Sequence, residues 1–251
     1  MTAQEMRMKA EKLHFFREIQ KDIPLYVDML ESLRQEDAVI LHDSGQALLL
    51  QLKSWPLYLL AAADPEEGER LLAGMTPDEN GLVAVVLHGK ELFSRAEVLG
   101  FTESTPCYQT LYDKNDLLPL HTELAIRHPD RTDYETICKA YTLPIGEDEI
   151  YASIDRPEFS AGYLGDLLAG FIGLHAEGSI GMLHVFEAFR GRGYALDLAA
   201  HMINRRMADG AFPYGQVFID NDASIALQKK MGLSFSGDYI CWKFKKESST
   251  K

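Results

Sequence analysis

The second half of the chain opens with apolar runs that are short and closely spaced. Each run is followed by the next within a few residues. Because so little chain separates them, helical crossovers do not fit, and the runs are predicted to pair as antiparallel strands. The Ala-Glu-Gly at 176–178 is the predicted turn of one hairpin. The predicted strands cover residues 160–164, 167–175 and 179–186.

A helical periodicity follows these strands. Five apolar residues recur at helical spacing, Gly210 stands where a left-handed residue ends a helix, and 214–220 is the next predicted strand. A strand at 123–127 and a helix near 130–141 precede the hairpins. These elements predict a mixed α/β fold in which helices cover the faces of a mixed sheet. The helical stripe consists of Leu196, Ala199, Ala200, Ile203 and Met207, and the earlier helix begins at Asp130 or Thr132.

The end of the first half resembles the end of the second. Residues 86–112 align with residues 218–244 at a constant offset of 132, each as a strand, a helix, a glycine stop and a final strand. The Leu-Gly-Phe at 99–101 falls on the Met-Gly-Leu at 231–233. The chain is therefore predicted to hold two tandem halves, joined near residues 114–123. The predicted domains are residues 1–117 and 118–251.

Two arginines and two glycines stand at the corner between a predicted strand and the helical stripe. A helix start presents amide groups without intrahelical partners, and the macrodipole adds positive charge there. Gly191 and Gly193 would let the backbone approach an anion, and Arg190 and Arg192 would add charge-assisted contacts. The corner is a candidate phosphate site, while an exposed turn with solvated arginines is the alternative for this motif alone.

A dinucleotide-binding reading of the same corner is disfavoured. Gly191 and Gly193 match two positions of the Rossmann fingerprint, but Leu196 occupies the third, and the preceding strands are predicted to be antiparallel.

The corner instead resembles the pyrophosphate loop of the GNAT superfamily of acyl-CoA-dependent N-acyltransferases. The motif of that loop is Q/R-x-x-G-x-G/A, and Arg190 to Ala195 match it at every fixed position. The block from Asn221 to Leu233 and the opening at 124–141 are also similar to this family.

The resemblance implies two GNAT-like halves, of which the first is degenerate. The residues that align with the loop in the first half read Tyr-Leu-Leu-Ala-Ala-Ala at 58–63, without glycine or arginine. Such a segment cannot form a phosphate cradle. This layout, in which a half that cannot bind acyl-CoA precedes a half that can, resembles the FR47-like and glycine N-acyltransferase branches of the superfamily.

The resemblance further implies that acetyl-CoA, or another acyl-CoA, is the cosubstrate and that no metal is needed. Backbone amides near Leu183 and Val185 would hold the thioester carbonyl, and Lys230, with Lys229, would meet a cofactor phosphate. The implied cofactor-binding residues are Leu183, Val185, Arg190, Gly191, Arg192, Gly193, Tyr194, Ala195, Asn221 and Lys230.

The usual catalytic positions of the family hold unusual residues here. The position of a general base, eleven residues before the loop, is Ser179, and Glu177 is the nearest carboxylate with the same strand parity. The position of the usual tyrosine acid is Gln228, which donates a hydrogen bond but no proton. Glu177, Ser179 and Gln228 are therefore the catalytic candidates, whereas His184 is expected in the core.

Composition narrows the function further. A net charge of −13 disfavours nucleic-acid partners, and the longest apolar run, 56–63, is too short to span a bilayer. Three cysteines without the spacing of metal ligands indicate reduced thiols and a cytoplasmic protein. We expect this protein to be a monomer or a homodimer. We expect an N-acyltransferase that acts on a primary amine of a small or amino-acid-like molecule. The alternatives are a CoA-binding sensor or interaction protein, and a purely structural tandem domain.

Overall fold

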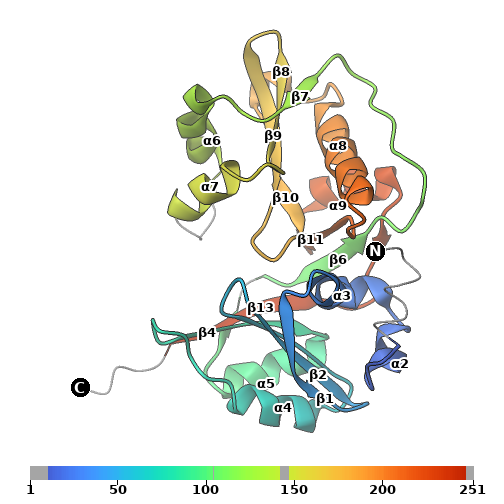
Figure 1. The fold of residues 1–251 in the computed structure, drawn as a ribbon, viewed down its shortest axis with the longest axis vertical. Coiled ribbons are helices and arrows are strands. Elements are labelled where there is room, and N and C mark those ends of the chain that lie inside the picture. Colours follow the sequence, from blue (N-terminus) through green and yellow to red (C-terminus); the bar gives the residue numbers. More distant parts are fainter. Residues whose placement is uncertain (1–10, 104, 142–146, 247–251) are drawn as a thin grey trace. The chain divides into compact units, whose positions relative to one another are not determined.

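The chain divides into two compact units in the computed structural model, which describes residues 11–103, 105–141 and 147–246. Each unit combines helices with a sheet, as the apolar pattern predicts (Figure 1). The α/β class with a mixed sheet is thus confirmed. Of the described residues, unit 1 comprises 11–103, 105–111, 216–222 and 234–246, and unit 2 comprises 112–141, 147–215 and 223–233.

Unit 2 is built on a sheet in the order β11-β10-β9-β8-β7. The strands from β7 to β10 pair antiparallel, and β10 pairs parallel with β11, so the predicted hairpins are confirmed. Figure 1 shows α6 and α7 on one face of these strands and α8 on the other. The strands are β7 (Ala125–Arg127), β8 (Ser160–Leu164), β9 (Leu167–Leu174), β10 (Ile180–Val185) and β11 (Tyr214–Phe218); the helices are α6 (Tyr134–Ala140), α7 (Glu147–Ile154), α8 (Tyr194–Ala208) and α9 (Asp222–Met231).

The helix α8 buries part of the predicted stripe. Ala199, Ala200 and Ile203 are buried, whereas Leu196 and Met207 are half-buried. Leu198 and Met202, which the prediction left out, are fully buried in the same core. The helix ends where Gly210 adopts a left-handed conformation, with φ of +64°, and the amide of Ala211 returns to the carbonyl of Arg206. The stop predicted at Gly210 is therefore confirmed.

Unit 1 has a sheet that begins β1-β2-β3-β4-β13, in which β3 and β4 are parallel. The helices α4 and α5 pack together on one face, and Asp28 of α3 bonds His88 of β4. The elements are α2 (Phe16–Ile19), α3 (Val27–Arg34), β1 (Ala38–Asp43), β2 (Ala47–Leu52), β3 (Leu57–Ala62), α4 (Pro65–Ala73), β4 (Leu82–His88), α5 (Phe93–Val98), β5 (Thr102–Glu103), β6 (Cys107–Leu111), β12 (Ser234–Phe235) and β13 (Ile240–Lys246).

The final strands are exchanged between the two sequence halves. The C-terminal strand β13 pairs with β4 over seven residues, from Ile240 opposite His88 to Lys246 opposite Leu82. The short strand β5 also pairs with β13, and β12 pairs with β6. Because the end of the second half completes a sheet that begins in the first, the compact units differ from the predicted division after residue 117.

We predict that the second half is unstable when separated from the first. A fragment beginning at Leu118 keeps β13 but loses β4, so seven paired residues lose their ladder. This fragment is expected to aggregate or to unfold at a lower temperature than the full chain, as measured by size-exclusion chromatography and circular dichroism. Co-expression with residues 1–117 should restore a soluble complex. A monomeric fragment that unfolds at the temperature of the full chain would contradict the prediction.

Candidate functional site

The corner between β10 and α8 depends on two glycines with left-handed backbones. Gly191 has φ of +76° and Gly193, the N-cap of α8, has φ of +90°. A side chain at such angles costs about 1–2 kcal/mol. The amides of Leu196 and Asp197 donate to the carbonyl of Gly193 and begin the helical ladder. The amides just ahead of them have no intrahelical acceptor, which suits an anion.

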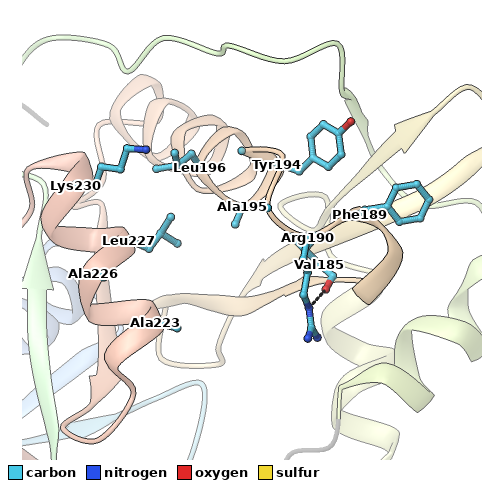
Figure 2. Close-up of a pocket in the computed structure, with 12 residues that line it drawn as sticks. Val185, Phe189, Arg190, Tyr194, Ala195, Leu196, Ala223, Ala226, Leu227 and Lys230 are labelled. Atoms are coloured by element: carbon cyan, nitrogen blue, oxygen red, sulfur yellow. Dashed lines mark hydrogen bonds between the residues drawn. The ribbon is translucent and has the colours of Figure 1, made fainter.

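This corner borders a cavity of about 400 Å³ within unit 2. The cavity lies between the start of α8 and one face of α9, which carries Lys230 at its far end (Figure 2). Seven of the predicted cofactor-binding residues line it: Val185, Arg190, Gly191, Gly193, Tyr194, Ala195 and Lys230. The rest of the lining is apolar and was not predicted from the sequence; it consists of Phe189, Leu196, Ala223, Ala226 and Leu227.

Arg190 turns back toward the strand that precedes it. Its Nε donates to the carbonyl of Val185 over 3.0 Å, as Figure 2 shows. The amide of Phe186 donates to Ala169 of β9, so the amide and carbonyl of Val185 point to the opposite edge of β10. On that edge β10 pairs with β11 at Ile180 and Gly215. The two strands are therefore joined near their beginnings, and Arg190 covers the edge of β10 at Val185.

The middle of β10 is irregular. The register with β9 shifts between Gly181 and His184, and Met182 has a left-handed φ of +52°. His184 lies between two aromatic rings, stacked on Phe171 at 5.3 Å and edge-on to Phe186. Burial, followed by the charge of Arg190, lowers the pKa of His184. These contacts favour the expected core histidine over a catalytic base.

Arg192 lies away from the cavity lining, among the residues that the structure describes. It stands beside Tyr194 and Glu123, and the hydroxyl of Tyr194 donates to Glu123 Oε1 over 3.0 Å. The pKa of Glu123 is lowered by a hydrogen bond with its own backbone amide, by the Tyr194 hydroxyl and by the charge of Arg192. Arg192 therefore stabilises the outer side of the corner in this conformation.

Asp197 fixes the start of α8 to the chain segment that leads into β7. Its buried carboxylate accepts from the amides of His121 and Thr122 and from the Thr122 hydroxyl, at distances of 2.6–3.1 Å. Burial opposes ionisation, but the hydrogen bonds from Thr122 and His121 outweigh it and lower the pKa of Asp197. This anchor holds the glycine corner in place.

The catalytic candidates on and before β10 are bonded to each other. Glu177 lies in the hairpin turn, where its carboxylate accepts from the hydroxyl of Ser179 over 2.5 Å. Both residues are buried, and the hydroxyl of Tyr214 donates to the carbonyl of Glu177. Neither candidate lines the cavity. The pair therefore stabilises the turn in this conformation.

The remaining predicted residues do not line the cavity. Leu183 is half-buried and packs against the core around α8. Gln228 is half-buried on α9, between the lining residues Leu227 and Lys230 in sequence. Asn221 is exposed immediately before α9, where its amide donates to the carbonyl of Phe218.

The first half has a different structure at the segment that aligns with the corner. Residues 58–62 lie in β3, Ala63 follows the end of the strand, and Tyr58 to Ala61 are buried in the sheet. A buried strand offers no helix start and no left-handed glycine, so this segment makes no cradle. Across the described parts of the chain, no helix is long and apolar enough to cross a membrane. The same parts hold no cluster of three or more His, Cys, Asp or Glu residues arranged for a metal ion.

We predict that Asp197→Asn destabilises the protein at neutral pH. The asparagine side chain would place an NH2 group against the backbone amides of His121 and Thr122, which are also donors. The free energy of unfolding, measured in urea, should therefore fall by about 2 kcal/mol or more. Because the folded pKa of Asp197 is lowered, its contribution to stability is complete above the unfolded pKa of about 4 and is lost as pH falls through the folded value.

The difference between wild type and Asp197→Asn should therefore shrink in acid. Asp209→Asn, an exposed change at the other end of α8, is the control and should leave stability nearly unchanged. Equal unfolding midpoints of wild type and Asp197→Asn at pH 7 would disprove the role of this anchor.

Comparison with known proteins assigns the fold. The family model described as FR47-like protein matches residues 159–242. No curated protein matches the chain. A putative acetyltransferase of the GNAT family from Novosphingobium aromaticivorans is similar in structure, with a TM-score of 0.56, 19% identity, and coverage of 90% of this chain and 99% of that one.

Two further structures are similar over most of the chain. A GCN5-related N-acetyltransferase from Kribbella flavida has a TM-score of 0.57 and 12% identity, covering 89% of this chain and 97% of its own. A Drosophila protein has a TM-score of 0.57 and 17% identity, covering 80% and 79%. The chain therefore has the fold of the GCN5-related N-acetyltransferases, and the family match over 159–242 supports the GNAT superfamily.

Proposed function

We propose that this protein is a GNAT-type N-acyltransferase that moves an acetyl or other short acyl group from acyl-CoA to a primary amine. The observation that carries the proposal is the cavity between the glycine corner and α9. It combines helix-start amides and two cations, Arg190 and Lys230, with an apolar wall. A ligand with phosphates at one end and an apolar arm at the other suits this lining.

The shape of the corner supports a bound pyrophosphate. A side chain placed at Gly191 would meet no described atom within 4 Å, so the outer side of the loop is open to a ligand. Acyl-CoA supplies an activated thioester. The amide of Val185, which points to the edge of β10 away from β9, is the donor we assign to the thioester carbonyl. Arg190 now covers this edge, and its guanidinium would turn toward the phosphates.

The proposed reaction joins the amine nitrogen to the acyl carbon, breaks the carbon–sulfur bond and releases the CoA thiol. An alkyl amine has a pKa of about 10 and must lose a proton before attack. Glu177 and Ser179 are buried and bonded to each other, so we propose that water removes this proton. The leaving thiolate, with a pKa of about 8.5, departs without a strong acid.

The acceptor that we propose is a small or amino-acid-like amine, and the protein acts in the cytoplasm as a monomer or homodimer. Among the described residues the three cysteines form no disulfide, which fits a reducing compartment. Because the first half lacks a glycine corner, we propose one acyl-CoA site in each chain. This single site distinguishes the proposal from a protein with two active halves.

We predict that Lys230→Glu weakens CoA binding at least tenfold, or by about 1.4 kcal/mol, because a cation in the cavity lining becomes an anion. Isothermal titration calorimetry with CoA measures the change. Lys229→Glu is the matched control, since Lys229 is exposed on the same helix and alters the net charge equally without lining the cavity. Its effect should stay within about threefold at physiological salt.

Equal affinities of Lys230→Glu and wild type for CoA would refute the cavity as the cofactor site. The function itself is tested with acetyl-CoA and a panel of primary amines, by the amine-dependent release of thiol. Tight CoA binding without such release would support the alternative, a CoA-binding sensor.

We also predict that no residue of the enzyme acts as an essential acid. Turnover of Gln228→Ala should fall less than tenfold, or about 1.4 kcal/mol, because the amide donates no proton. At saturating acyl-CoA the wild-type rate should rise with pH through the ionisation of the amine, without a falling limb below pH 10. A thousandfold loss of turnover in Gln228→Ala, or a rate that falls again at a pH below the pKa of the amine, would show that a residue of the enzyme does act as an essential acid.

A further inference from the structure

A polar cluster lies in the core of unit 1, and the proposed acyl transfer uses none of its members. It consists of Asp28 of α3, His88 of β4 and Gln109 of β6, all of them buried. None of the three lines the cavity. Polar side chains in a core are costly unless their polar atoms find partners, so the hydrogen bonds of this buried polar cluster restrict the protonation states of its members.

The imidazole of His88 meets a hydrogen-bond acceptor at each of its two nitrogens. Nδ1 lies 3.1 Å from the carbonyl oxygen of Leu60, and Nε2 lies 2.8 and 2.9 Å from the two carboxylate oxygens of Asp28. A carbonyl and an ionised carboxylate only accept, so a nitrogen forms a hydrogen bond here only when it carries a proton. With a proton on both nitrogens, the ring is a positively charged imidazolium.

The surroundings of Asp28 favour its ionised form. Its Oδ1 also accepts from the backbone amide of Met29 and from Nε2 of Gln109, each over 2.8 Å. The same Nε2 donates to the carbonyl of Leu25, and this bond fixes the orientation of the amide. Oε1 of Gln109 is buried and has no partner among the residues that the structure describes. The buried polar cluster is thus rich in acceptors, and a His88 ring with a single proton would leave a further acceptor unpaired.

The contact with Tyr26 also favours a positive charge on the His88 ring. Tyr26 ends the 3-10 helix η1 (Ile23–Tyr26) and stacks on His88 with a centroid distance of 6.0 Å and an interplanar angle of 22°. The face of a tyrosine ring attracts a cation. Burial, followed by the charges of nearby carboxylates, raises the pKa of Tyr26 to about 12, so its hydroxyl stays neutral at pH 8. These carboxylates belong to Glu18, Asp22 and Asp238.

We propose that His88 is a buried imidazolium that holds α3 on the sheet of unit 1, and that alkaline pH releases the helix. Asp28 comes from α3, His88 from the end of β4 and Leu60 from β3, so the charged ring joins the helix to two strands. His88 also faces Ile240 where β4 pairs with β13. Loss of the proton would leave the carboxylate of Asp28 buried without its cation, which is strongly destabilising. This role does not depend on the proposed acyltransferase function.

Unfolding of unit 1 should release the extra proton of His88. An unfolded histidine has a pKa of about 6.5 and is mostly neutral above it, whereas the folded ring holds a proton on each nitrogen. The unfolding equilibrium constant should therefore rise about tenfold from pH 7 to pH 8, below the ordinary pKa of a cysteine thiol, about 8.5. Trp55 and Trp242 both belong to unit 1, so their fluorescence in urea follows this transition in the full chain.

The Asp28→Asn variant tests the role of the charge, because asparagine keeps the size of the side chain but removes the anion that holds the second proton of His88. The variant should be less stable than wild type at pH 7, and its unfolding constant should change less than about threefold from pH 7 to pH 8. Asp220→Asn, an exposed change on unit 1, is the matched control and should keep the tenfold rise. Equal pH dependences of wild type and Asp28→Asn would overturn the proposal.

Nuclear magnetic resonance of the wild-type chain tests the charge directly, without a variant that has to fold. With 15N-labelled histidines and the His88 ring assigned through bonds from its backbone, both ring nitrogens should carry a proton at pH 7.5. In Asp28→Asn the same ring should carry a single proton, whereas Asp220→Asn should match wild type. A wild-type His88 ring with one unprotonated nitrogen at pH 7.5 would refute the buried imidazolium.

Discussion

The pairing of β13 with β4 is the interaction on which the architecture depends. It joins the last strand of the chain to a strand of the first half through seven consecutive residue pairs. Backbone pairing of this length is cooperative, and its loss would leave two strand edges open. The second half therefore depends on the first for the partner of its own final strand. It also brings Trp242 and Phe244 of the C-terminal strand to Trp55 of the first half.

The glycine corner depends on anchors that come from other segments. Asp197 binds the chain before β7, and Tyr194 binds Glu123, so both contacts tie the first turn of α8 to residues 121–123. Held in this way, the helix start presents its amides without rearrangement when an anion arrives. Arg190 is the mobile part of the arrangement that we propose, because one side chain serves first the carbonyl of Val185 and then the phosphates.

An acidic protein that binds an anionic cosubstrate needs its positive charge concentrated at the site. The chain carries a net charge of −13, yet the cavity lining includes Arg190 and Lys230 and no acidic residue among those described. Screening limits the repulsion from distant carboxylates to about one Debye length, roughly 8 Å in the cell. Under the proposed function, the local cations and helix-start amides would therefore outweigh the distant carboxylates at the phosphates.

The sequence by itself determined the features that depend on short stretches of chain. The spacing of apolar runs predicted β8, β9 and β10, the stripe from Leu196 predicted α8, and the glycines located the corner, because strand alternation, helical periodicity and left-handed angles are local properties. Only the tertiary structure decided which residues of α9 face the cavity, that Arg190 turns back to Val185, and that β13 pairs with β4. These features depend on pairing and packing between distant segments, for which neighbouring residues carry no signal.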